Sequence, residues 1–197
     1  GARQTNTKKI SLDNVFSTPN VNPYDEVKWE KRDVVMTNWR DGSITFEQRG
    51  VEFPDFWSFN ASQIVTSKYF RGKLGSDQRE NSLKQLIDRV VGKYVEQSKK
   101  DDYFATPADV EIFENELKWM LLHQVFSFNS PVWFNVGTDS PQQVSACFIL
   151  GVEDSMESIL NWYVEEGKIF KRGSGSGVNL SRLRGSKEGL STGGRAS

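Results

Sequence analysis

The sequence predicts an α/β protein in which a mainly helical N-terminal region is followed by the start of a parallel sheet. Apolar residues recur at helical spacing over residues 78–98 and 107–126. Residues 144–150, VSACFIL, form a continuous apolar run of strand length, which is typical of a strand buried on both faces. A helical stretch, a glycine-rich turn and a second short apolar run come next. This order predicts one βαβ unit, the start of an α/β sheet or barrel.

Three regions are expected along the 197 residues. Residues 1–28 form an extended arm, because their prolines discourage a helix. Residues 29–127 form a mainly helical region with a small hairpin, whose tight turn is favoured by Asp41 and Gly42. Residues 128–197 begin as a loop and continue into the βαβ unit.

Capping residues indicate where the helices of the first half begin. Asn60 is expected to cap a helix over residues 61–72. Thr106, followed three residues later by Asp109, predicts a capping box at the start of helix 107–126.

In the second half, Asp154 or Ser155 is expected to cap a helix over residues 155–171. A short strand near Val178–Leu180 then completes the βαβ unit. The apolar side chains expected to face inward from this helix are Met156, Ile159, Leu160 and Tyr163.

Composition excludes several classes of function. The 25 basic and 26 acidic residues balance, so charge predicts no nucleic-acid or membrane partner. The polar N-terminus holds no signal core, and we expect a cytoplasmic protein. A single cysteine, Cys147, forms no internal disulfide, and with one histidine we predict no metal site. We interpret His123 as structural, near a helix C-terminus where a partial positive charge suits the helix dipole.

Taken one at a time, the candidate site residues leave alternatives open. A lone cysteine is usually a small buried hydrophobe, and a redox role for Cys147 would need a partner thiol outside this chain. The glycines of 171–179 could expose backbone N–H groups to an anion, but their spacing fits neither common phosphate-binding motif, so a tight turn is equally compatible. Arg184 suits phosphate or is a solvated charge, and Asp154 could bind a ribose hydroxyl or be a helix cap.

Several motifs in order are more specific than any one of them. FNSPVWFNVGT, QQVSACFILGVEDSMESI and KRGSGSGVNLSRLRGSKEGLSTGGRAS follow one another over the last third of the chain. Upstream, the segments WEKRD, DGSITFEQRGVEFPDFWS and IVTSKYFRG add to the pattern. Together they resemble the large catalytic subunit of ribonucleotide reductases, most nearly the adenosylcobalamin-dependent class II type. The resemblance covers residue 29 to the last residue.

This resemblance implies a ten-stranded α/β barrel that reduces ribonucleotides to deoxyribonucleotides by thiyl-radical chemistry, with adenosylcobalamin as cofactor. By motif position, Cys147 is similar to the first of two redox-active cysteines, on the first barrel strand. An external thioredoxin-like reductant would regenerate the thiols. The positions that match the substrate pocket are Ser130, Pro131, Ala146, Cys147, Ser174 and Gly175.

Other positions match the family's allosteric site, which binds a deoxynucleoside triphosphate effector. Asp154 corresponds to the residue that holds the effector's deoxyribose, and Arg184 to one that contacts its phosphates. Ser155 is also expected to belong to this effector site. The resemblance also implies that helix 155–171 helps to form a homodimer interface.

The radical cysteine, the second redox cysteine and the cobalamin contacts lie later in the family's barrel. We therefore expect this chain to be inactive alone and to need the rest of the barrel, on a complementary chain or a missing segment. Two alternatives stay open: a reductase of the same family that depends on a metal-radical subunit, and a non-catalytic nucleotide-binding module in which Cys147 merely packs.

Overall fold

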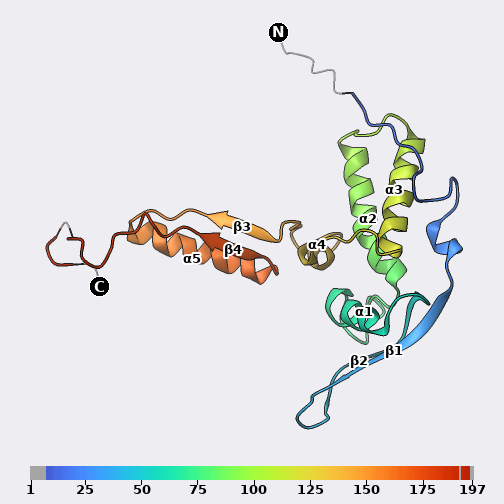
Figure 1. Cartoon of the computed structure of the whole chain (residues 1–197), viewed down its shortest axis with the longest axis horizontal. Helices are drawn as coiled ribbons and strands as arrows, with labels where there is room; N and C mark the ends of the chain where they lie inside the picture. The colour runs from blue at the N-terminus through green and yellow to red at the C-terminus, as the bar shows by residue number, and fades with distance from the viewer. Residues whose placement is uncertain (1–7, 191, 196–197) are drawn as a thin grey trace. The chain divides into compact units, whose positions relative to one another are not determined.

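The computed structural model describes residues 8–190 and 192–195, which form two compact units (Figure 1). Unit 1 comprises residues up to 128 together with 136–142, and unit 2 comprises 129–135 together with residues from 143 onward. Among the described helices, none has the length and apolar character needed to cross a membrane.

Unit 1 begins its regular structure with the 3-10 helix η1 (Pro23–Glu26), and the predicted hairpin follows. Strands β1 (Trp29–Thr37) and β2 (Ile44–Pro54) pair antiparallel, and Gly42 supplies the positive φ of 70° that the turn between them requires.

The next helix begins earlier than predicted. Ser58, not Asn60, is the N-cap of α1 (Phe59–Ile64), because its Oγ accepts a hydrogen bond from the N–H of Ala61 at 3.1 Å. The chain continues as a single π-helical segment, η2 (Val65–Tyr69), so the helical stretch ends before residue 72.

Two long helices, α2 (Leu83–Lys100) and α3 (Pro107–Leu122), pack against each other in unit 1. Helix α2 begins five residues later than predicted, because the capping box is made by Ser82. The capping box predicted for α3 at Thr106 and Asp109 is confirmed.

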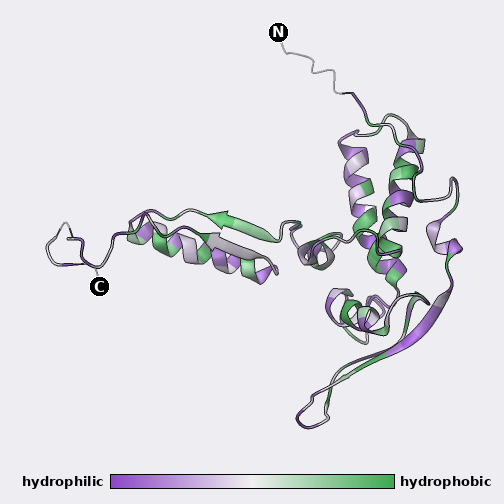
Figure 2. Ribbon diagram, in the orientation of Figure 1, coloured by the Kyte–Doolittle hydropathy of each residue, from purple (hydrophilic) through white to green (hydrophobic). Residues whose placement is uncertain are grey.

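The core of unit 1 lies between these helices, the hairpin and the η2 segment. Figure 2 shows green, hydrophobic stretches on both α2 and α3. The fully buried apolar side chains among the described residues of unit 1 come from the hairpin, the two helices and the residue that follows η2. They are Val34, Val51, Phe53, Phe70, Leu83, Leu86, Ile87, Val90, Val91 and Leu122.

Carboxylates of α3 hold the N-terminal arm in place. Asp109 accepts a hydrogen bond from the N–H of Leu12 at 2.8 Å, and Glu116 accepts the N–H groups of Phe16 and Ser17 at 3.0 and 2.8 Å. Burial raises the pKa of Glu116, but the hydrogen bonds that it accepts from the Ser17 hydroxyl and from the N–H groups of Phe16 and Ser17 outweigh burial and place the pKa below its usual value. The arm therefore binds best to ionised carboxylates.

Unit 2 contains the predicted βαβ unit. Strands β3 (Cys147–Leu150) and β4 (Gly175–Val178) pair parallel, and α5 (Met156–Lys171) connects them, as Figure 1 shows. Strand β4 lies on the glycine-rich stretch that was predicted to be a turn, and a short helix, α4 (Ser130–Asn135), stands where a loop was predicted.

Two expectations for unit 2 are wrong. Strand β3 is not buried on both faces, because Cys147 and Ile149 are exposed while Phe148 and Leu150 are half-buried. On α5 the side chains of Met156, Leu160 and Tyr163 are 70, 57 and 60% exposed instead of inward. The covered face of α5 carries Ile159, Trp162, Glu166 and Ile169.

The α/β class is therefore confirmed in its coarse form. The described residues form two separate two-stranded sheets and helices, and no closed barrel.

Candidate functional site

One face of the β3–β4 sheet is open and carries the cysteine. Cys147 pairs in register with Gly175, and Ile149 with Gly177. All four residues are exposed, whereas the alternate residues of both strands are half-buried. Side chains alternate between the faces of a strand, so the thiol and the two glycines lie on the same face. A ligand on this face could reach both the Cys147 thiol and glycine backbone.

The glycines after α5 have two different roles. Gly173 has a φ of +82°, and a Cβ there would lie 2.9 Å from the ring of Phe134, so only glycine fits this turn. At Gly175 a Cβ would meet nothing closer than the carbonyl oxygen of Ala146 at 3.8 Å. The fold therefore tolerates a side chain at 175, and the absence of one leaves free the space beside Cys147.

Ser174 lies between these glycines and faces the interior. Its side chain is 6% exposed, and its hydroxyl donates to the carbonyl oxygen of Ser145 at 2.6 Å. The N–H of Gly175 donates to the carbonyl oxygen of Ala146 at 2.8 Å. These two bonds bring together four of the residues predicted to bind substrate: Ala146, Cys147, Ser174 and Gly175.

The other two predicted substrate-binding residues, Ser130 and Pro131, form the first turn of α4, and Pro131 is buried. Asn129 precedes them, and its side chain accepts the N–H of Val132 at 3.2 Å and donates to the carbonyl oxygen of Val144 at 2.9 Å. Asn129 thereby ties α4 to the segment that leads into β3.

Asp154 and Arg184, the predicted effector residues, meet after the end of β3. Arg184 Nε donates to Asp154 Oδ2 at 2.7 Å, and each side chain is about one-third exposed. Ser155 is the N-cap of α5, and its hydroxyl accepts the N–H of Ser158 at 3.2 Å. A second ion pair, between Arg182 and Glu153, lies at the surface. The arrangement offers two carboxylates and two guanidinium groups at the opposite end of β3 from Cys147.

Sequence reasoning missed three amide residues that organise this unit: Asn129, Asn135 and Gln143. Asn135 and Gln143 are 7 and 8% exposed. Asn135 Nδ2 donates to the carbonyl oxygens of Pro131 at 2.9 Å and of Arg172 at 3.2 Å. One pattern in the sequence could have indicated them: each of these amide residues stands beside a short apolar run, in a segment that we interpreted as a loop.

Within the described ranges, no group of three or more His, Cys, Asp or Glu residues could hold a metal ion. His123 is the C-cap of α3, and its ring stacks on those of Trp119 and Phe56, with centroids 4.1 and 5.4 Å apart. Burial lowers the pKa of His123, against the opposing charge of Glu26. The histidine has a packing role, but the idea that a positive charge on it serves the helix dipole is not supported.

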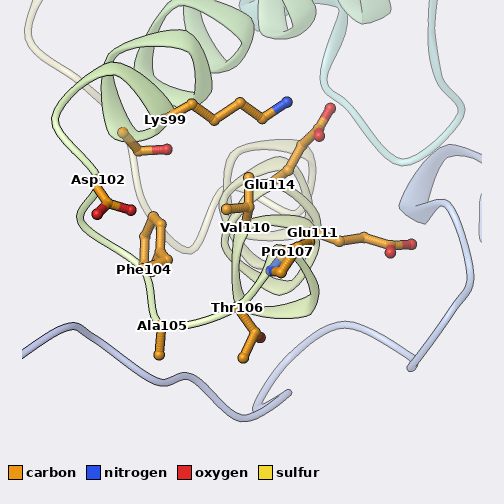
Figure 3. Close-up of a pocket in the computed structure, with 10 residues that line it drawn as sticks. Lys99, Asp102, Phe104, Ala105, Thr106, Pro107, Val110, Glu111 and Glu114 are labelled. Carbon is orange, nitrogen blue, oxygen red and sulfur yellow. The ribbon is translucent and has the colours of Figure 1, made fainter.

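Unit 1 contains a pocket of about 450 Å³ between the end of α2 and the start of α3. Figure 3 shows Phe104 and Val110 beside this space, with the charged ends of Lys99, Glu111 and Glu114 around it. None of the residues predicted to bind substrate or effector lines this pocket.

Comparison with known sequences matches both parts of the chain. A family model described as class II vitamin B12-dependent ribonucleotide reductase matches residues 31–124, and one described as the ribonucleotide reductase barrel domain matches residues 145–197. The second match contains β3, α5 and β4.

Similar proteins carry the same description. A vitamin B12-dependent ribonucleotide reductase of Streptomyces clavuligerus is 71% identical over 97% of this chain and 20% of its own length. Those of Streptomyces avermitilis and Rhodopirellula baltica are 68 and 39% identical over 100 and 89% of this chain, and again over 20% of their own length. The chain thus spans about one-fifth of the length of these curated relatives.

Proposed function

Because the chain belongs to the class II, vitamin B12-dependent ribonucleotide reductase family, we propose that it takes part in reducing ribonucleotides to deoxyribonucleotides, with Cys147 as one of two redox-active cysteines. The observation that carries this proposal is the exposed thiol of Cys147, in register with Gly175 on an open sheet face. A reducing thiol must reach the substrate from a rigid strand, and this position meets that requirement.

The proposed reduction balances over two thiols. The ribose loses a hydroxyl group as water and gains a hydrogen, while Cys147 and a second cysteine give up two electrons and two protons and form a disulfide. This chain holds one cysteine, so its partner thiol lies outside these 197 residues. The thiyl radical that abstracts the 3′ hydrogen, and the ten-stranded barrel around it, also belong to this proposal.

The substrate would lie over the open face of β3 and β4. The thiol of Cys147 and the uncovered backbone of Gly175 face it, and Ala146 adds a small side chain beside them. Ser130 and Pro131 would border the substrate from α4, as the resemblance implies. The buried hydroxyl of Ser174 is already hydrogen-bonded, so we propose that Ser174 contributes through its backbone.

Asp154, Ser155 and Arg184 would bind the effector. The Asp154 carboxylate suits a deoxyribose hydroxyl, and the Arg184 guanidinium retains donors for a phosphate besides the Nε that bonds to Asp154. Such an effector is a deoxynucleoside triphosphate, bound at the far end of β3 from the proposed redox thiol.

A homodimer is supported by α5. Met156, Leu160, Tyr163 and Val164 form an exposed apolar stripe on it. Exposed stripes of this kind mark interfaces. The further partners we propose are a complementary chain or segment with the rest of the barrel and a thioredoxin-like reductant.

The proposed cofactor of the assembled enzyme is adenosylcobalamin, which would supply the radical. By the resemblance, the residues that contact it lie later in the family's barrel, and the one imidazole of this chain, that of His123, is stacked on the rings of Trp119 and Phe56. We therefore assign no cobalamin contact to this chain. The class II match over residues 31–124 favours cobalamin over a metal-radical subunit, and dependence of turnover on added adenosylcobalamin distinguishes the two.

The decisive experiment is Cys147→Ser in the assembled enzyme, meaning this chain together with the rest of the barrel. We expect turnover with a thioredoxin-like reductant to be abolished, and binding of the deoxynucleoside triphosphate effector by calorimetry to be unchanged. Turnover at the parental rate would refute the redox role of Cys147. A third outcome is possible, in which the assembled protein binds the effector but reduces no ribonucleotide, whether residue 147 is Cys or Ser. That outcome would favour the non-catalytic nucleotide-binding module.

A further inference from the structure

Three polar side chains are buried in the described part of unit 2: Asn135, Gln143 and Ser174. Buried polar groups are costly unless they are hydrogen-bonded, and these three bond to one another's segments. They join α4, the segment before β3, and the turn between α5 and β4.

The hydrogen bonds through Ser174 run in one direction. Gln143 Nε2 donates to Ser174 Oγ, and Ser174 Oγ donates its own proton to the carbonyl oxygen of Ser145. A serine hydroxyl has only one proton, so the donor on Gln143 leaves that proton free for Ser145. The amide of Gln143 therefore determines which way the hydroxyl of Ser174 points.

This chain of bonds ends beside the proposed redox thiol. Ser145 stands two residues before Cys147, and Ser174 immediately precedes Gly175, the register partner of Cys147. The bond between Ser174 and Ser145 thus fixes the start of β3 against the start of β4. A shift at this junction would move the thiol relative to the glycine backbone on the open face.

We propose that Gln143 is a positioning residue for the reduction at Cys147, acting through Ser174. The inference rests on the proposed function, because it concerns how the Cys147 thiol is held against substrate. It assigns a task to a buried amide that precedes β3 and donates to Ser174.

The first test is Gln143→Met in the assembled enzyme, which keeps the length of the side chain and removes its donor. We expect kcat to fall about ten-fold with KM changed less than about two-fold, because misplacement of a reacting group acts on the chemical step. The matched control is Gln142→Met. Gln142 is an exposed neighbour whose amide bonds to Gly137, Thr138 and Ser140 and not to Ser174, so its kcat should be unchanged.

A double variant that combines Gln143→Met with Ser174→Ala tests whether Gln143 acts through Ser174 or only stabilises the fold. If Gln143 acts through Ser174, the double variant should lose no more kcat than the more impaired single variant. Losses that multiply, or a Gln143→Met enzyme within two-fold of the parental kcat, would overturn the proposal.

Gln143→Glu keeps the test open if the methionine variant folds poorly. A carboxyl group at 143 can donate to Ser174 only when protonated. We expect the kcat of this variant, relative to the parent, to rise as the pH falls through the range of a carboxyl pKa. A flat ratio between the two enzymes would contradict a role for the donated proton.

Failure of the proposed function would look different. The rate at which iodoacetamide alkylates Cys147, followed by mass spectrometry of its peptide, reports the placement of the thiol without turnover. If Gln143→Met changes this rate several-fold but Cys147→Ser retains full activity, Gln143 positions the thiol and the redox role is wrong. If Gln143→Met leaves both alkylation and kcat unchanged, the positioning role is wrong and the proposed function stands.

Discussion

Both units bury polar as well as apolar side chains, but they differ in how many apolar side chains are fully buried: among the described residues, ten in unit 1 and, in unit 2, only that of Val152. Unit 2 buries the amides of Asn135 and Gln143 and the hydroxyl of Ser174, and it exposes many of its apolar side chains. In unit 1, aromatic and aliphatic residues such as Phe53, Leu86 and Leu122 are excluded from water. In unit 2, Ile149 is 93% exposed while Gln143 is 8% exposed. We interpret unit 1 as stabilised mainly by apolar burial, and unit 2 as a region whose geometry is defined by hydrogen bonds.

Hydrophobic burial is non-directional, so it stabilises unit 1 without demanding one exact placement of each group. Hydrogen bonds have preferred distances and angles, so the bonds of Asn135, Gln143 and Ser174 define where each backbone segment of unit 2 lies. The apolar stripe on α5 then remains available for an interface. The four predictions below test this contrast, from the largest expected effect to the smallest.

Phe53→Ala should have the largest effect on stability. Phe53 is fully buried and stacks on Phe70 with centroids 5.8 Å apart, so truncation leaves a cavity in the core of unit 1. We expect the free energy of unfolding to fall by about 3–5 kcal/mol in urea denaturation. The control is Trp39→Ala. The side chain of Trp39 is 86% exposed at the hairpin turn, so its removal should change the free energy of unfolding by less than about 0.5 kcal/mol. Equal losses would show that unit 1 does not depend on this core.

Met156→Asp tests whether the exposed stripe of unit 2 is an interface. Met156 is 70% exposed, so a charge there should leave the fold intact and weaken dimerisation by about 2 kcal/mol, as at a central interface position. Native mass spectrometry over a dilution series measures the loss. Asn161→Asp, also exposed on α5, is the control and should dimerise normally. An unchanged dimer with Asp at 156 would argue against this interface.

Ile159 lies on the same helix as Met156 but is not a suitable position for the interface test. The sequence placed it with Met156 on one apolar face, but the structure leaves it half-buried on the side of α5 that carries Ile169. A charge at 159 would disturb packing within unit 2, so it cannot serve as a test of the interface alone.

Gly175→Ala should affect catalysis and not folding. A Cβ at 175 would have room, with its nearest neighbour 3.8 Å away, but would stand beside Cys147 on the open face. We expect kcat/KM of the assembled enzyme to fall about ten-fold, or about 1.4 kcal/mol, with Tm almost unchanged.

Gly137→Ala is the control in unit 1, at a glycine that the fold itself requires. Its φ is +73° and a Cβ would lie 2.4 Å from the carbonyl oxygen of Arg89, so Tm should fall. If Gly175→Ala lowers Tm as much, the role of the glycine is structural.

Local signals in the sequence predicted much of the fold. The capping box at Thr106 and Asp109, the turn at Gly42 and the order strand–helix–strand are all confirmed, because each depends on residues close together in the chain. The strand at Gly175–Val178 was missed because glycines disfavour strands locally, and only the parallel partner β3 reveals it.

The candidate site was less accessible to sequence reasoning. Motif resemblance pointed to Cys147, Asp154 and Arg184, and the structure brings Asp154 and Arg184 together across 30 residues of sequence. Gln143 and Asn135 could not be identified, because their partners lie up to 37 residues away and no local pattern predicts which amide is buried. Such long-range polar contacts follow from packing, not from periodicity.

The smallest effect we predict concerns the N-terminal arm of unit 1, which is held by polar contacts like those of unit 2. Hydrogen bonds keep the pKa of Glu116 in the folded protein below its usual value. The stability that ionised Glu116 adds to the folded arm is therefore fully present above the unfolded pKa, about 4.3, and is lost as the pH falls through the lower folded pKa. We expect the NMR amide signals of Phe16 and Ser17 to shift as the pH is lowered, with a midpoint below that of an ordinary glutamate.

Glu116→Gln should remove most of this titration, because its side chain no longer ionises. Asp109, whose pKa is lowered by the Thr106 hydroxyl and by the N–H of Leu12, should still titrate in the signal of Leu12. The control is Glu111→Gln, an exposed carboxylate on the same helix, which should leave the midpoint at Phe16 and Ser17 unchanged. If Glu116→Gln retains the full shift, a group other than Glu116 titrates beside Phe16 and Ser17, and the arm does not depend on ionisation of this carboxylate.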